Sequence, residues 1–114
     1  MNLKFRAWDK ENSTMLTWEQ LKSEAWFSWF ADENLVFMQS TGVKDKNGVE
    51  IYAGNIIKER GGLTPFIEFD EEDLSFKSVD RHCRKLYVPK GYLNKYAEVI
   101  GNIYENPELM EVEE

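Results

Sequence analysis

The stretch from Met38 to Arg60 constrains the fold most, because it contains two turn signals that lie between short apolar segments. The apolar run 35–38 favours a buried strand. The four residues 45–48, DKNG, predict a tight turn, since Asn and Gly tolerate the positive φ that such turns need. Val49, Ile51 and Tyr52 resume the apolar pattern, Gly54-Asn55 interrupts it, and Ile56-Ile57 opens another strand. This spacing is typical of a β-meander.

The N-terminal part of the chain predicts two strands and a helix. Apolar and polar residues nearly alternate over 3–8, which indicates a strand, and Met15-Leu16 can return beside it. Thr17 and Gln20 fit a capping box that opens a helix. Apolar residues then follow at helical spacing, so we expect a helix over residues 18–30.

The C-terminal part predicts further strands, so that the strands come mainly from residues 35–79 and 97–104. Residues 81–96 differ from the rest, because they contain five Lys or Arg, no Asp or Glu, and an internal proline. We expect this segment to be an irregular excursion from the sheet. Asn106 opens a last helical turn. The pattern as a whole predicts a mostly β protein with a minor helical element.

Three blocks of the chain resemble a known signature: LKFRAWDKENSTM at the start, TGVKDKNGVEIYAGNII in the centre and EVIGNIYENPEL near the end. They resemble the YopX family of phage and prophage proteins and lie in that family's order. The resemblance implies an SH3-like barrel with an N-terminal helix between strands, a phage origin and no assigned activity. One position departs from the family pattern, because Asn55 stands where the family usually has Asp.

Length and composition predict one cytosolic domain over residues 1–114. The chain has 114 residues with 14% aromatics, which favours a small barrel over a helical bundle. No apolar run approaches the roughly 20 residues of a membrane span, and residues 1–10 do not resemble a signal peptide. Cys83 is the only cysteine, so no internal disulfide can form. We therefore expect the protein in the cytosol of the host cell.

The residues that most resemble catalytic or metal-binding groups do not form a recognisable site. His82 and Cys83 are adjacent, and neighbours in an extended segment point to opposite faces, which argues against a nucleophile pair. The acidic cluster within 68–73 lacks the spacing of a calcium loop and is interpreted as a solvated hairpin turn. Gly61-Gly62 is a hairpin signal and not a phosphate loop. The sequence thus predicts no catalytic residue, no metal, no cofactor and no enzyme activity.

The predicted helix contains more aromatic residues than one buried face needs. An exposed apolar surplus usually marks a partner surface, and Trp is favoured at binding hot spots. We therefore expect contact with a protein partner, or self-association, through this helix. The alternative is a helix that is buried on two sides. The candidate contact residues are Trp18, Trp26, Phe27, Trp29 and Phe30.

Nucleic-acid binding through segment 81–96 is the alternative function. Its cations could contact phosphates and its tyrosines could stack on bases. The net charge of −7 opposes such an encounter. An internal alternative is that the basic segment pairs with the acidic turn at 68–73, in its own or a neighbouring chain. The candidate residues are Arg81, Arg84, Lys85, Tyr87, Lys90, Tyr92 and Lys95.

Overall fold

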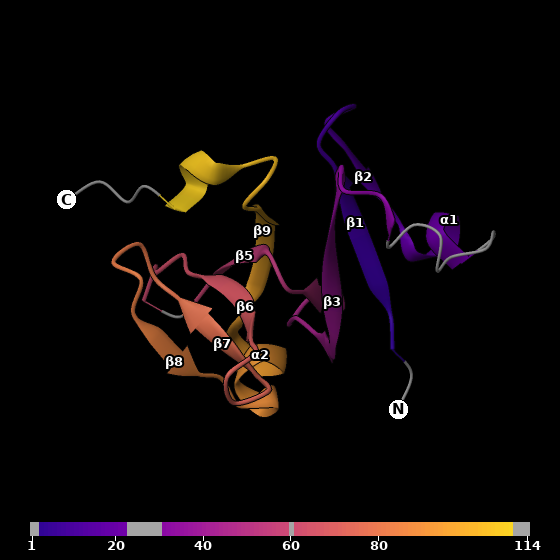
Figure 1. The fold of residues 1–114 in the computed structure, drawn as a ribbon. Helices are drawn as coiled ribbons and strands as arrows, with labels where there is room; N and C mark the ends of the chain where they lie inside the picture. The colour runs from indigo at the N-terminus through magenta and orange to yellow at the C-terminus, as the bar shows by residue number, and fades with distance from the viewer. Residues whose placement is uncertain (1–2, 23–30, 60, 111–114) are drawn as a thin grey trace. The chain divides into compact units, whose positions relative to one another are not determined.

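The computed structural model describes residues 3–22, 31–59 and 61–110. The chain divides into two compact units, residues 1–40 and residues 41–114, and strand β3 (Leu35–Lys44) begins in the first unit and ends in the second. Both units are built mainly of strands, so the prediction of a mostly β fold is confirmed (Figure 1). The curled sheets are consistent with an SH3-like barrel. In the described residues, no helix combines the length and the apolar character needed to cross a membrane.

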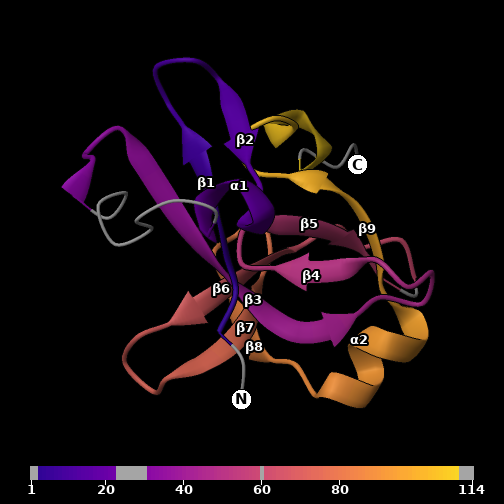
Figure 2. The same cartoon turned by 90° about the vertical axis from the view of Figure 1, so that its right-hand side faces the viewer.

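The described part of the first unit is a small antiparallel sheet with one helix. Strand β1 (Phe5–Asp9) lies between β2 (Thr14–Leu16) and the first part of β3 (Figure 2). Helix α1 is described over Trp18–Lys22. The predicted capping box is present, because the Gln20 N–H donates to the Thr17 hydroxyl over 3.2 Å and the Thr17 N–H donates to the Gln20 amide oxygen over 2.8 Å. Residues 23–30 of the predicted helix lie outside the described part.

The core of the first unit forms where three elements place apolar side chains on one side. Ala7, Leu21 and Leu35 are buried together, one each from β1, α1 and β3. Phe5 and Trp18 pack against this cluster, with ring centroids 6.3 Å apart. Alternation along β1 explains the arrangement, because residues 5 and 7 share a face of the strand.

The second unit holds a five-stranded antiparallel sheet in the order β8-β7-β6-β5-β9. A buried cluster that includes Ile51, Ile57, Ile67, Leu93 and Ala97 forms its core. The end of β3 neighbours β4 in a second sheet. The elements of this unit after β3 are β4 (Glu50–Tyr52), β5 (Asn55–Lys58), β6 (Phe66–Asp70), β7 (Ser75–Val79), β8 (Lys85–Tyr87), α2 (Lys90–Tyr96), β9 (Glu98–Asn102) and the 3-10 helix η2 (Pro107–Met110).

The prediction of an irregular segment at 81–96 is wrong, because this segment forms β8 and α2. Helix α2 follows Pro89, whose fixed φ suits the start of a helix. Leu93 and Ala97 are four residues apart and both reach the core, so burial of this pair stabilises a helix of only seven residues. Two apolar positions are too few for a periodic signal in the sequence, which is why the helix was missed.

The predicted turn at 45–48 is confirmed, and its first residue is buried. Asp45 is 2% exposed, and its carboxylate accepts from the backbone N–H groups of Asn47, Val49 and Val99, each over 2.8 Å. Burial on its own raises the pKa of Asp45, but the three N–H donors outweigh burial and hold the pKa below its usual range. One ionised side chain therefore joins the turn before β4 to the start of β9.

We expect Asp45→Asn to lower the free energy of unfolding by about 2–4 kcal/mol, because an amide nitrogen would face an N–H donor in place of an oxygen. The depressed pKa means that the wild-type advantage is present above about pH 4 and is lost as the pH falls through the folded pKa. Urea unfolding between pH 3 and pH 7 measures this difference. The exposed Glu11→Gln is the control, and equal stability of Asp45→Asn and wild type at pH 7 would contradict the account.

Asn55 shows why an amide suits the position at which the family pattern has Asp. Its Oδ1 accepts from the Tyr52 N–H over 2.7 Å, and its Nδ2 donates to the Gly101 carbonyl over 3.0 Å. The side chain is 3% exposed and so bridges β5 and β9 away from water. An ionised carboxylate would keep the first contact and would place an oxygen against a carbonyl oxygen in the second.

We therefore expect Asn55→Asp to lower the free energy of unfolding by about 1–3 kcal/mol at pH 7. The loss should shrink as the pH falls, because the new carboxyl group becomes protonated and can then donate to the Gly101 carbonyl. Asn94→Asp is a matched control, since Asn94 Nδ2 also donates to a carbonyl, that of Lys44, over 3.1 Å at an exposed site. Thermal unfolding at several pH values compares the two variants. A loss as small for Asn55→Asp as for Asn94→Asp would show that the buried amide is not required.

Candidate functional site

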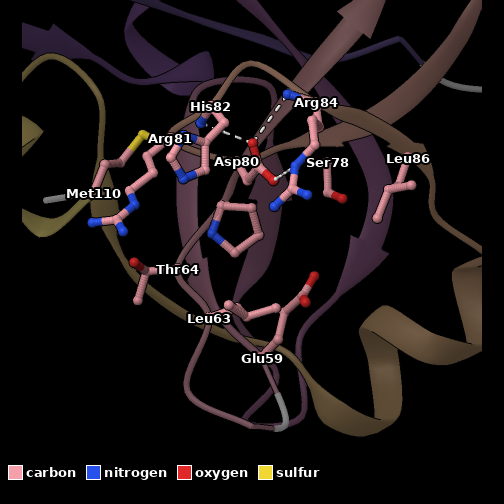
Figure 3. A pocket seen from close by; sticks show the side chains of 11 residues that line it. Glu59, Leu63, Thr64, Ser78, Asp80, Arg81, His82, Arg84, Leu86 and Met110 are labelled. Carbon is pink, nitrogen blue, oxygen red and sulfur yellow. Dashed lines mark hydrogen bonds and ion pairs between the residues drawn. The ribbon is translucent and has the colours of Figure 1, made fainter. Parts of the chain in front are cut away.

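A pocket of about 230 Å³ lies in the second unit, beside the edge strand β8 (Figure 3). It is formed by the loop before β6, the ends of β5 and β7, the loop between β7 and β8, β8 itself, and the end of η2. Its lining mixes apolar and charged side chains. The lining residues are Glu59, Leu63, Thr64, Pro65, Ser78, Asp80, Arg81, His82, Arg84, Leu86 and Met110.

Asp80 shapes the loop that borders this pocket. Its carboxylate accepts from the backbone N–H groups of His82 over 2.9 Å and Arg84 over 3.0 Å, and from Arg84 Nε over 2.7 Å. The Arg84 backbone N–H, followed by the Arg84 side chain and the His82 N–H, outweighs the effect of burial and lowers the pKa of Asp80. Cys83 takes a left-handed φ of 64° to close the loop. These contacts stabilise the turn and tie the Arg84 Nε to Asp80.

Two nitrogens of Arg84 are left for a ligand. Asp80 occupies Nε, and neither Nη group has a hydrogen-bond partner among the described residues. Figure 3 shows the guanidinium pointing toward the middle of the pocket. The Thr64 hydroxyl also lines the pocket, and this buried oxygen lacks a hydrogen-bond partner within the described part of the chain. A ligand with acceptor oxygens could satisfy the Nη groups of Arg84.

Glu59 lies on the side of the pocket away from Asp80 (Figure 3). Burial raises the pKa of Glu59, and a hydrogen bond with the Tyr92 side chain offsets the rise only in part. The carboxylate is therefore less readily ionised than an exposed glutamate.

Strand β8 forms one edge of the five-stranded sheet and is exposed along its whole length (Figure 1). The side chains of Leu86 and Tyr87 are 67% and 70% exposed. Asp80 N–H donates to the Arg84 carbonyl, and Ser78 lies opposite Leu86. Hydrogen-bonded pairs alternate along an antiparallel ladder, so the N–H and C=O groups of Lys85 and Tyr87 point away from β7.

A second hollow, of about 410 Å³, carries three lysines. Lys46, Lys58 and Lys95 line it together with Tyr96, Glu59 and Glu98. Lys95 Nζ lies 5.4 Å from the centroid of the Tyr96 ring. Lys58 and Glu98 are opposite each other on β5 and β9, so the two glutamates offset much of the positive charge.

The aromatic residues proposed for partner binding are mostly outside the described residues, namely Trp26, Phe27, Trp29 and Phe30. Trp18 is described, is partly buried and packs against the core of the first unit. Packing within its own unit therefore explains the aromatic residue at position 18, and no binding protein is needed to explain it. Contact through the remainder of the helix stays a prediction.

The structure pairs part of the basic segment with acidic residues of the same chain. Lys85 Nζ lies 2.7 Å from a Glu68 carboxylate oxygen, and this contact raises the pKa of Lys85. Arg84 is held by Asp80. The rings of Tyr92 and Tyr96 contact each other, with centroids 5.3 Å apart. The structure therefore does not gather the basic residues and tyrosines on one free surface.

The acidic cluster forms the turn between β6 and β7, as interpreted from the sequence. Lys77 Nζ contacts Asp70 over 3.0 Å and Asp73 over 2.7 Å, and its hydrogen bonds lower the pKa of both carboxyl groups. The described residues include no group of three His, Cys, Asp or Glu that could hold a metal ion. His82 and Cys83 are exposed on the loop between β7 and β8.

Sequence reasoning missed the contribution of Thr64, Glu59 and Leu86 to a pocket. Leu86 carries a weak signal, because apolar Leu86 and Val88 alternate with Lys85 and Tyr87 in a short strand pattern. Thr64 and Glu59 carry no such signal in the sequence. They follow β5 and precede β6, and only the folded sheet brings them beside the end of β7.

Comparison with known proteins identifies a family and two solved structures that this chain resembles. A family model described as YopX protein matches residues 22–111. The chain is similar to protein EF1440 from Enterococcus faecalis, with 28% identity over 96% of this chain and 99% of the other, and a TM-score of 0.65. It also shares its fold with protein yopX from Bacillus subtilis, with 22% identity over 96% and 98% of the two chains and a TM-score of 0.56. No curated protein matches the chain. Because the family model covers most of the sequence, the chain belongs to the YopX family.

Proposed function

We propose that the protein is a non-enzymatic binding module of a phage or prophage that acts through protein–protein contacts. Two features support this. The family match indicates no catalytic family. At the pocket of about 230 Å³, Asp80 holds a loop in shape by accepting from three donors, and among the described residues no nucleophile there is hydrogen-bonded to a base.

The observation that carries the proposal is the exposed edge strand β8. Leu86 and Leu63 both line the pocket and are 67% and 61% exposed, and Tyr87 exposes its ring on the opposite face of the strand. Exposed apolar groups that cluster around a hollow are typical of protein-binding surfaces. Self-association or partner contact through the predicted helix 18–30 is a further part of this proposal.

Nucleic-acid binding remains the alternative function and receives less support. Of its candidate phosphate contacts, Lys85 is ion-paired with Glu68, and Arg84 is engaged through Nε by Asp80. The net charge of −7 opposes association with a polyanion.

Protein binding at β8 can be tested by affinity purification from prophage-carrying cells, with wild type compared with Leu86→Ser. We expect wild type to retain a partner that Leu86→Ser loses, because the side chain is 67% exposed and contributes contact area without supporting the core. Leu74→Ser is the control, since Leu74 is 74% exposed at the β6–β7 turn. The proposal fails at this surface if Leu86→Ser and Leu74→Ser recover the same proteins in the same amounts as wild type.

A further inference from the structure

We propose that β8 and its adjacent pocket bind an extended, acidic segment of a partner protein, which adds to the sheet as a new edge strand and places a carboxylate against Arg84. This inference rests on the proposed protein-binding function and names the partner's chemistry. It joins two features of the second unit, an open strand edge and a pocket with unused hydrogen-bonding groups.

The open edge supplies the backbone contacts. The N–H and C=O groups of Lys85 and Tyr87 point away from β7, and none of them is hydrogen-bonded within the described residues. An extended peptide laid along β8 can pair with these groups as a neighbouring strand does. Leu86 cannot serve in this way, because its backbone groups point toward Ser78.

The pocket supplies the side-chain contact. Leu86 lies on the same face of the sheet as Ser78, and both line the pocket. Side chains alternate along a strand, so every second residue of an added strand lies on this face. The side chain of such a residue can reach the Arg84 Nη groups, which have no partner in the described part of the protein.

Charge complementarity selects a carboxylate for this side chain. Of the five Lys or Arg in segment 81–96, Arg81 and Arg84 line the pocket, together with the carboxyl groups of Glu59 and Asp80. Burial raises the pKa of Glu59, so this carboxyl group is less readily ionised than an exposed one. Asp80 does not repel the incoming group strongly, because His82 and Arg84 already donate to both of its oxygens. Arginine presents paired N–H groups that match the geometry of a carboxylate.

The short length of β8 explains why a side-chain contact is required. The strand has three residues and is followed at residue 89 by proline, and Lys85 lies on the edge itself. Short edges with Lys and Pro resist nonspecific strand pairing. Backbone pairing alone would therefore be weak, and the contact with Arg84 would supply selectivity.

The test begins with a random peptide library displayed on phage and selected against the immobilised wild-type protein, with counter-selection against Leu86→Ser. We expect enriched peptides to carry Asp or Glu within an extended, β-forming pattern. The affinity of the best peptide, and of its counterpart with Gln or Asn in place of the acid, is then measured by fluorescence polarisation.

Tyr87→Pro and Tyr87→Thr form the matched pair for strand addition. Both remove the ring, but only proline removes the outward N–H, at an edge position where proline leaves the pairing with β7 intact. We expect Tyr87→Pro to weaken the peptide about tenfold more than Tyr87→Thr, the loss of roughly one hydrogen bond. Circular dichroism and thermal unfolding confirm that both variants fold.

Arg84→Gln and Lys90→Gln form the matched pair for the carboxylate. Each removes one positive charge from segment 81–96, but only Arg84 lines the pocket. We expect Arg84→Gln to abolish the preference for the acidic peptide over its amide counterpart, and Lys90→Gln to keep it.

The possible failures are distinguishable. If Tyr87→Pro and Tyr87→Thr weaken the peptide equally, strand addition is wrong although binding at Leu86 stands. If Arg84→Gln keeps the preference for the acid, or no preference exists, the carboxylate contact is wrong. If light scattering shows a wild-type dimer that Tyr87→Pro dissociates, the occupant is a second copy and not an acidic partner. If no peptide survives counter-selection, protein binding at β8 fails altogether.

Discussion

The ionised carboxylate of Asp45 is the contact on which the second unit depends. It accepts from two N–H groups of its own turn and from Val99 at the start of β9, more than fifty residues along the chain. The Lys46 N–H donates beside it to the Ala97 carbonyl over 3.0 Å, at the end of α2. Ala97 and Leu93 then pack against Ile51 of β4. One buried charge thus sets where β4, α2 and β9 meet around the core.

Two turns of this unit share one hydrogen-bond pattern, and the comparison shows what the sequence could and could not predict. In Asp45–Val49 and Asp80–Arg84, the aspartate accepts from the N–H groups two and four residues later. In both turns the residue three positions later has a positive φ, 85° at Gly48 and 64° at Cys83. The first turn was predicted, because Asn-Gly signals that conformation. The second was not, because Cys rarely adopts it.

The features that the sequence predicted are local, and those that it missed depend on distant contacts. Strand positions, the Thr17–Gln20 capping box and the final helical turn follow from residues that lie within one turn of each other. Helix α2 depends on burial of Leu93 and Ala97 in a core built by β4, β5 and β6. The pocket joins residues from 59 to 110. No pattern within a short window carries that information.

The candidate site follows from the same local chemistry. The Asp80 turn connects β7 to β8 and ties Arg84 to Asp80, so a turn with the same hydrogen bonds as the Asp45 turn forms one wall of the pocket. Strand β8 has β7 on one side only. A strand edge that is anchored by its turn and has a cation at one end presents backbone groups in the extended geometry that strand addition requires.

Amide hydrogen exchange measured by NMR on the free protein tests this account of β8 most directly. The Leu86 N–H points toward Ser78 in the ladder, and the Tyr87 N–H points outward. We expect slow exchange at Leu86 and fast exchange at Tyr87, with Tyr87 becoming protected when an acidic peptide binds. Equal protection of Leu86 and Tyr87 in the free protein would show that the outer edge of β8 is already covered, and would contradict the account.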